Sequence, residues 1–210
     1  MAQPRHPTEQ FPSSHFLVCA GTILFESSCA PLRVCLLRHT VRDEWLLPKG
    51  RKDLGEHVPA TALRETFEET GYPCVPLALD LVTRAPAPGA QTKDAPARVR
   101  ACADEPFMLT LRHITVEGAA DAGGAGAGAG AKLVWWFAAV RTGADKVDGT
   151  QTAVESFESR FFAVDEALRV ATFQADRDVI AAAVELVRAT YPEAREGFVR
   201  EQEQEQSLSL

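Results

Sequence analysis

The chain has 210 residues, which is enough for one well-packed domain and too few for two ordinary domains with long loops. Its 46% hydrophobic and 24% charged residues exclude collagen-like, fully disordered and coiled-coil proteins. The net charge of -7 argues against a general nucleic-acid coat, because that role needs a basic surface for phosphates.

The five cysteines are scattered, with no C-x-x-C pair and no histidine at metal-ligand spacing, so they indicate reduced thiols. Residues 1–14 lack the apolar run of a signal peptide. No segment approaches the roughly 20 apolar residues that a membrane span needs. We therefore expect a cytoplasmic or nuclear protein with no membrane partner.

The first half of the chain is predicted to begin with strands. Residues 1–14 are rich in Pro, Ser, Gln and His and are predicted to be disordered. Residues 15–25 and 32–38 are rich in β-branched and apolar residues and predict a β-hairpin. Residues 45–47 predict a short strand, which Pro and Gly in residues 48–50 end and turn into a loop.

Residues 58–70 are predicted to form a helix. Pro59 suits its first turn, and Gly71 suits the left-handed position just after its end. Leu63 and Phe67 lie four residues apart, so they are expected to anchor the helix to the core.

The second half predicts strands at residues 75–83, 107–116 and 132–140, and an amphipathic helix at about 173–190. Strands and helices mixed in this order predict an α/β sandwich. The single domain would span residues 15–193. Residues 85–105 and 118–131 cannot bury much apolar surface and are predicted to be loop insertions. The Glu/Gln-rich tail, residues 194–210, is predicted to be disordered.

Three glutamates of the predicted helix lie at i, i+3 and i+4, so Glu65, Glu68 and Glu69 share one narrow face. Their mutual repulsion would become attraction around a cation, and hard cations such as Mg²⁺ prefer oxygen ligands. The alternative from spacing alone is a solvated charged face, which is the commoner explanation of a charge run.

The surrounding residues resemble the Nudix box, G-x5-E-x7-R-E-U-x-E-E-x-G-U, where U is usually bulky and apolar. The specified positions are occupied by Gly50, Glu56, Arg64, Glu65, Glu68, Glu69 and Gly71. Seven matches at fixed spacing arise by chance on the order of once in 10⁸ starting points. Thr66 departs from the pattern at the first U; its hydroxyl is expected to bond the carbonyl four residues earlier, with only a small effect on stability.

The resemblance implies a Nudix-type α/β/α sandwich with a mixed β-sheet, and a hydrolase that cleaves phosphoanhydride bonds with Mg²⁺ or Mn²⁺. Arg64 would orient the glutamates, and the general base would be Glu65 or a downstream loop glutamate, for which Glu155 and Glu158 are candidates. The implied metal ligands are the Gly50 carbonyl, Glu56 (directly or through water), Glu65, Glu68 and Glu69.

Basic residues near the box are candidate phosphate ligands: Arg38, Arg42, Lys49, Arg51 and Lys52. Of these, Arg51 and Lys52 follow Gly50 and are predicted to project beside the metal-bound phosphates. Ordinary surface charge, balanced by Asp43, Glu44 and Asp53, remains the alternative. Trp136 faces the opposite way from its neighbours in the predicted strand, so it is a candidate for stacking on an adenine, with core packing as the alternative.

The run Leu47-Pro48-Lys49-Gly50 and the short linker resemble two Nudix branches, the diphosphoinositol polyphosphate and the diadenosine polyphosphate hydrolases. The expected partner is therefore a polyphosphorylated small molecule. A nucleotide-sugar or mRNA-cap pyrophosphohydrolase would carry the same box. A non-catalytic Nudix module for ligand sensing or protein binding would be expected to lose box glutamates, and this chain keeps all of them.

Overall fold

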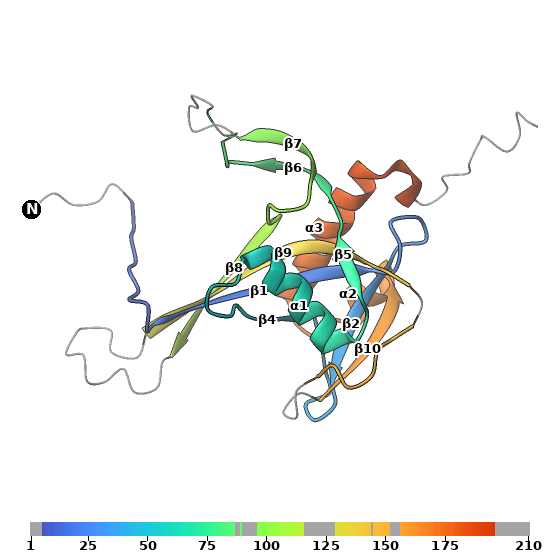
Figure 1. Ribbon diagram of the computed structural model, residues 1–210, viewed down its shortest axis with the longest axis horizontal. Coiled ribbons are helices and arrows are strands. Elements are labelled where there is room, and N and C mark those ends of the chain that lie inside the picture. Colours follow the sequence, from blue (N-terminus) through green and yellow to red (C-terminus); the bar gives the residue numbers. More distant parts are fainter. Residues whose placement is uncertain are drawn as a thin grey trace, which may run out of the picture.

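The computed structural model describes residues 6–86, 89, 96–115, 129–143, 145–151 and 156–195. Helices cover both faces of a central β-sheet (Figure 1). Helix α1 (Val58–Thr70) lies on one face, and α2 (Val164–Val170) and α3 (Gln174–Thr190) lie on the other. This is the predicted α/β/α sandwich. None of the described helices is long and apolar enough to cross a membrane.

The central sheet is mixed, as predicted. Its strands are β1 (Phe16–Phe25), β2 (Arg33–His39), β3 (Glu44–Leu46), β4 (Lys49–Arg51), β5 (Cys74–Pro76), β8 (Met108–Thr115), β9 (Ala129–Arg141) and β10 (Phe157–Ala163). The order is β10-β2-β1-β9-β5, with β3 beside β2, β4 beside β1 and β8 beside β9. Strands β1 and β9 are parallel, and the other neighbours are antiparallel.

Strand β1 separates the two halves of the core. Cys19, Ile23 and Phe25 point to the α3 side, where they join the apolar face of that helix. Ala20 and Leu24 point to the α1 side. Because both faces are covered, the strand is apolar except for Thr22 and does not alternate between apolar and polar residues.

Helix α1 has the predicted ends but packs by a different face. Gly71 has φ of 75°, and its amide donates to the Phe67 carbonyl at 2.8 Å. Leu63 and Phe67 are only half-buried, whereas Ala62 and Thr66 are fully buried against β1. Leu63 nevertheless packs against the core, as predicted, whereas Phe67 belongs to none of the described core clusters. The fully buried face is formed by small side chains, which let the helix approach the sheet closely.

Several predicted loops contain strands. Residues 49–51 form β4, because their backbone pairs with residues 19–21 of β1. Within the predicted insertion 85–105, β7 (Ala97–Cys102) pairs with β6 (Leu79–Thr83) in a separate two-stranded sheet, at the top of Figure 1.

The predicted boundaries also shift. The predicted strand 75–83 is divided between β5 and β6. The end of the predicted Gly/Ala loop, residues 129–131, belongs to β9, and residues 118–128 lie outside the described part of the chain. A 3-10 helix, η2 (Pro192–Ala194), ends the described fold, and most of the predicted tail, residues 196–210, is likewise outside it.

The described part of the predicted N-terminal segment has no helix or strand, but it contacts the sheet. The Phe11 ring lies 6.4 Å from the His113 ring of β8, between centroids. Glu9 Oε2 lies 3.7 Å from His113 Nδ1. The segment therefore lies beside β8.

Candidate active site

One guanidinium joins three glutamates at the start of α1. Arg64 Nε and Nη2 donate to the two carboxylate oxygens of Glu56 at 2.8 and 2.9 Å. Its Nη1 donates to Glu65 Oε1 at 2.9 Å and to Glu68 Oε2 at 3.0 Å. The planar fork of arginine suits this arrangement, because each N–H points at a fixed angle. The predicted orienting role of Arg64 therefore has a geometric basis.

Glu56 precedes α1 and is held in its ionised form. Hydrogen bonds from Arg64, then from the Thr61 hydroxyl and the Asp53 amide, lower the pKa of Glu56 to about 2 despite its partial burial. In the reverse direction, the Glu56 and Glu65 carboxylates raise the pKa of Arg64. The ion pair therefore stays charged across the neutral range.

Strand β4 brings backbone groups to the glutamates. A Cβ atom on Gly50 would overlap the Glu65 carboxylate, so only glycine lets the strand lie this close. The Lys49 amide donates to Glu69 Oε2 at 2.8 Å. The close contact between Gly50 and Glu65 agrees with the prediction that Gly50 belongs to the glutamate site. The hydrogen bond from the Lys49 amide was not predicted.

The residues that surround this point suit a divalent metal. Glu65 and Glu69 are only 8% and 6% exposed, and buried carboxylates need compensating charge. All the donors are carboxylate or carbonyl oxygens, which Mg²⁺ and Mn²⁺ prefer. Among the described residues no three acidic, His or Cys side chains converge as a ready-made site. In the structure the Glu56, Glu65 and Glu68 carboxylates are instead hydrogen-bonded to Arg64.

The far end of α1 is fixed by two side chains that precede β10 and one within that strand. Thr150 donates to the Glu68 carbonyl at 2.8 Å, Gln151 to the Glu69 carbonyl at 3.0 Å, and Ser159 to the Thr70 carbonyl at 2.6 Å. These bonds satisfy helix carbonyls that have no partner within the helix. No local motif marks these residues, so the sequence did not predict them.

Two of the predicted phosphate ligands are paired with carboxylates at the β2–β3 turn. Arg38 lies 2.7 Å from Asp43 and 3.6 Å from Glu158, and Arg42 lies 3.0 Å from Glu44. These distances favour the alternative of balanced surface charge, which the sequence had left open.

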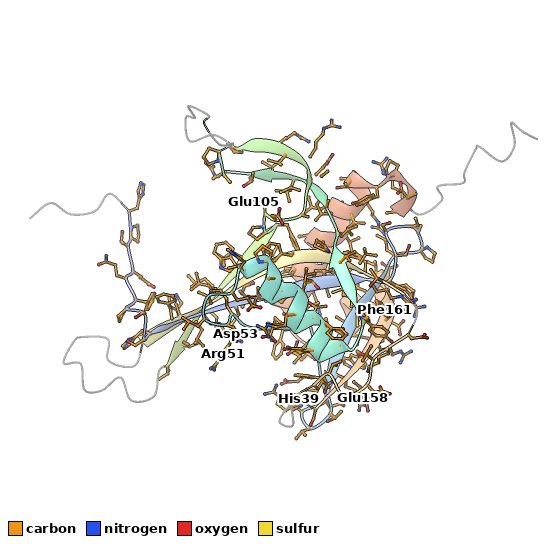
Figure 2. The ribbon with its side chains drawn as sticks, viewed as in Figure 1. His39, Arg51, Asp53, Glu105, Glu158 and Phe161 are labelled. Atoms are coloured by element: carbon orange, nitrogen blue, oxygen red, sulfur yellow. The ribbon has the colours of Figure 1, made fainter. Side chains whose placement is uncertain are left out.

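The two candidate bases beyond α1 have different outcomes. Glu158 lies in β10, not in a loop, because residues 157–163 pair with β2 throughout. Figure 2 shows Glu158 beside His39 and away from Arg51 and Asp53. Glu155 lies outside the described residues.

The remaining candidates also differ from expectation. Lys49 and Arg51 pair with Gly21 and Cys19, so their side chains lie on the sheet face opposite α1 and not beside the glutamates. Lys52 Nζ donates to the neighbouring Asp53 carbonyl at 2.9 Å. Trp136 is 2% exposed within the core, and its Nε1 donates to Thr110 at 3.0 Å. Trp136 is therefore a core residue, as the alternative predicted. No face of its ring is open to stack on an adenine.

The fold and this site together define a class: a sandwich of helices around a mixed sheet, with an arginine-centred glutamate cluster held against a glycine. Residues 16–183 match the model of the NUDIX domain family. The chain belongs to the Nudix family.

Individual relatives are more distant. Over 72 residues the chain is 35% identical to an 8-oxo-(d)GTP phosphatase of Mycolicibacterium smegmatis, a match that covers 30% of this chain and only 22% of that protein's length. The structure is similar to a C. elegans Ap4A hydrolase in a binary complex, with TM-score 0.51 and 15% identity over 82% of this chain and 98% of that one. A NUDIX hydrolase from Nitrosomonas europaea has TM-score 0.47 and 15% identity, over 80% of this chain and 87% of that one. At such identities the structural likeness shows the fold alone.

Proposed function

We propose that this protein is a Mg²⁺- or Mn²⁺-dependent hydrolase that cleaves a phosphoanhydride bond in a polyphosphorylated small molecule. One observation carries the proposal: Arg64 binds Glu56, Glu65 and Glu68 where Gly50 meets the helix, and the neighbouring Lys49 amide binds Glu69. Arg64 supplies one positive charge to three of these carboxylates, and the oxygen-rich surroundings of the helix are the kind of site that a divalent cation prefers.

Each residue of the cluster has a distinct task in this proposal. Glu65, Glu68 and Glu69 hold the metal with the Gly50 carbonyl, and Arg64 fixes the angles of the carboxylates. A divalent metal held by these residues would supply polarisation of the phosphoryl oxygens and a lower pKa for the attacking water. Glu65 then accepts the proton of that water, since its carboxylate lies directly against Gly50.

We propose diadenosine polyphosphates and diphosphoinositol polyphosphates as the substrates to test first. The Leu47–Gly50 run supports both branches. The Mycolicibacterium smegmatis relative is named for 8-oxo-(d)GTP, so modified nucleoside triphosphates are the second candidate class. All three classes share a chain of anionic phosphates and differ in the group attached to it.

The test is a panel of these substrates, with capped RNA and nucleotide sugars added, incubated with pure protein and Mg²⁺ and analysed for products. Excess EDTA should abolish turnover. Glu69→Gln should lower kcat by roughly 10² to 10⁴, the range expected when a group of the metal or acid–base machinery is lost. Glu185→Gln, on the exposed side of α3, is the matched control. Full turnover in EDTA, or full activity of the Glu69 variant, would contradict the proposal.

A further inference from the structure

Four cations share the sheet face opposite α1. On this face Arg112 of β8 lies opposite Lys132 of β9, which in turn lies opposite residue 17 of β1. Two residues further along β1, Cys19 lies opposite Arg51, and then Gly21 lies opposite Lys49. Residues directly opposite each other in neighbouring strands point to the same face, as do alternate residues of one strand. We call Lys49, Arg51, Arg112 and Lys132 the cationic cluster.

The electrostatics of Lys132 agree with the strand register that places the four groups on one face. Burial lowers the pKa of Lys132, and Lys49, Arg112 and Arg51 lower it further. Among the described residues, no carboxylate lies within ion-pair distance of any of the four side chains. Asp176, in the first turn of α3, is the described acid that faces them: burial raises its pKa, while Lys49 and Arg112 lower it.

The position of the cationic cluster connects it to the glutamates. Both sites are built on β4, because Gly50 faces α1 whereas Lys49 and Arg51 face the other way. In the described chain β4 pairs with β1 alone, so its second edge carries no further strand. One strand is only about 5 Å wide. A chain of phosphates that starts at the glutamates can therefore cross this edge and reach the cations.

A hollow of about 240 Å³ adjoins the cationic cluster. It is lined in part by Arg51, Leu17 and Ile114. Leu17 lies opposite Lys132, and Ile114 follows Arg112 by two residues, so this part of the lining is on the same face as the cations. An anion held by the cations would thus have space beside it for a bulky group.

Four crowded cations, faced by Asp176 but with no described carboxylate at ion-pair distance, destabilise the free protein, and a bound anion reverses the sign of that contribution. We propose that Lys49, Arg51, Arg112 and Lys132 bind the phosphates of the substrate that are not cleaved, and that Arg112 and Lys132 determine the preference for long polyphosphates. The substrate role rests on the proposed hydrolase function, whereas the binding of anions does not.

The experiment measures binding of inorganic tripolyphosphate by calorimetry in EDTA. Without a metal the glutamates repel the probe, so any binding reports on the cations. We compare the parent protein with Arg112→Gln/Lys132→Gln, and with Arg100→Gln/Arg169→Gln as the matched control. The control loses the same charge from exposed positions on β7 and α2. The melting temperature of each variant verifies folding.

We expect at least about tenfold weaker binding of tripolyphosphate by Arg112→Gln/Lys132→Gln, and parent-like binding by the control, because charge-assisted contacts are lost only in the first variant. With Mg²⁺, the KM for a tetraphosphate substrate should rise more than kcat falls. Equal affinity in parent and variant, or an equal loss in the control, would overturn the anion site. If the parent binds the probe through these residues but hydrolyses no polyphosphate, the proposed function fails and the anion site stands.

Discussion

Gly50 and Glu65 show how the site depends on one missing side chain. The glycine Cα lies against the carboxylate, and a methyl group there would overlap it. Gly143 offers a contrast, because its φ is +79° but nothing lies within 4 Å of the position that a Cβ would occupy. A substitution at Gly50 would therefore displace the Glu65 carboxylate, whereas a substitution at Gly143 would only strain the backbone.

We expect Gly50→Ala to lower kcat roughly 10²-fold, because a displacement of about 1 Å at a catalytic group costs that much. Gly143→Ala should cost about 1 to 2 kcal/mol of stability through its left-handed backbone and leave turnover near that of the parent. Steady-state kinetics and thermal melting of both variants are the measurement. A Gly50→Ala enzyme with parent-like kcat would show that Glu65 tolerates displacement.

The Glu56–Arg64 pair predicts a pH dependence of stability. The pKa of Glu56 is lowered from 4.5 to about 2 in the folded state. A carboxyl group with a lowered folded pKa contributes stability above its unfolded pKa, and this contribution is lost as the pH falls through the folded pKa. The contribution should therefore be complete at pH 6 and decline between pH 4.5 and 2.

Urea denaturation of the parent and Glu56→Gln at pH 6 and pH 3 tests this dependence. After allowance for solvent screening, the stability difference between the two proteins should shrink by about 1 to 2 kcal/mol at the lower pH. Glu185→Gln, whose side chain is 79% exposed, should show no comparable change. A difference for Glu56→Gln that is the same at both pH values would mean that Arg64 does not stabilise the folded protein through this carboxylate.

At the scale of elements, α1 is held on β1 by a buried pair of hydroxyls. Thr66 Oγ1 donates to the Ala62 carbonyl at 2.7 Å, the bond that its place in the box predicts. It also lies 2.8 Å from Thr22 Oγ1. Because the single hydroxyl hydrogen of Thr66 is used on the helix, Thr22 must be the donor between them. Both side chains are fully buried.

Because Thr22 donates to Thr66, replacing each threonine with valine should cost a different amount of stability. Thr66→Val leaves the Thr22 hydroxyl buried without an acceptor and should destabilise the protein by about 1 to 3 kcal/mol. Thr22→Val leaves Thr66 bonded to Ala62 and should cost less, and the double variant should resemble Thr22→Val. Denaturant unfolding of the three variants forms a double-mutant cycle. Equal costs for the two single variants would show that the donor has been misassigned.

The elements that could be predicted are those with a strong local signal. Helix α1 has proline at its start, glycine at its end and a motif within it, and α3 has a regular apolar stripe. Strands β4, β7 and β10 were missed, because their residues become strands only through pairing with distant partners. The glutamates followed from the motif. In the cationic cluster, Lys49 and Arg51 were candidate phosphate ligands, whereas Arg112 and Lys132 were not predicted, since their place depends on the register between β8 and β9.

Over the whole molecule, positive and negative charges are separated across the sheet. Four buried or half-buried glutamates meet on the α1 side, and four cations meet on the other. The net charge of -7 therefore conceals two local sites of opposite sign. An ion of opposite charge would reduce the repulsion among like charges at each site, beyond what Arg64 already contributes on the glutamate side. Folding stability should consequently respond to divalent cations through the glutamates.

A divalent cation that binds only the folded chain raises stability by RT ln(1 + [L]/Kd). At ten times Kd this is about 1.4 kcal/mol, which corresponds to a rise in melting temperature of about 3 to 6 °C for a chain of this size. Calorimetric melting with and without Mg²⁺ at constant ionic strength should show this rise in the parent and in Glu185→Gln. Glu65→Gln/Glu69→Gln should lose it, although removal of carboxylate repulsion leaves that variant folded. The same rise in the double variant would place the metal elsewhere on the molecule, and the role of the α1 glutamates would have to be reassigned.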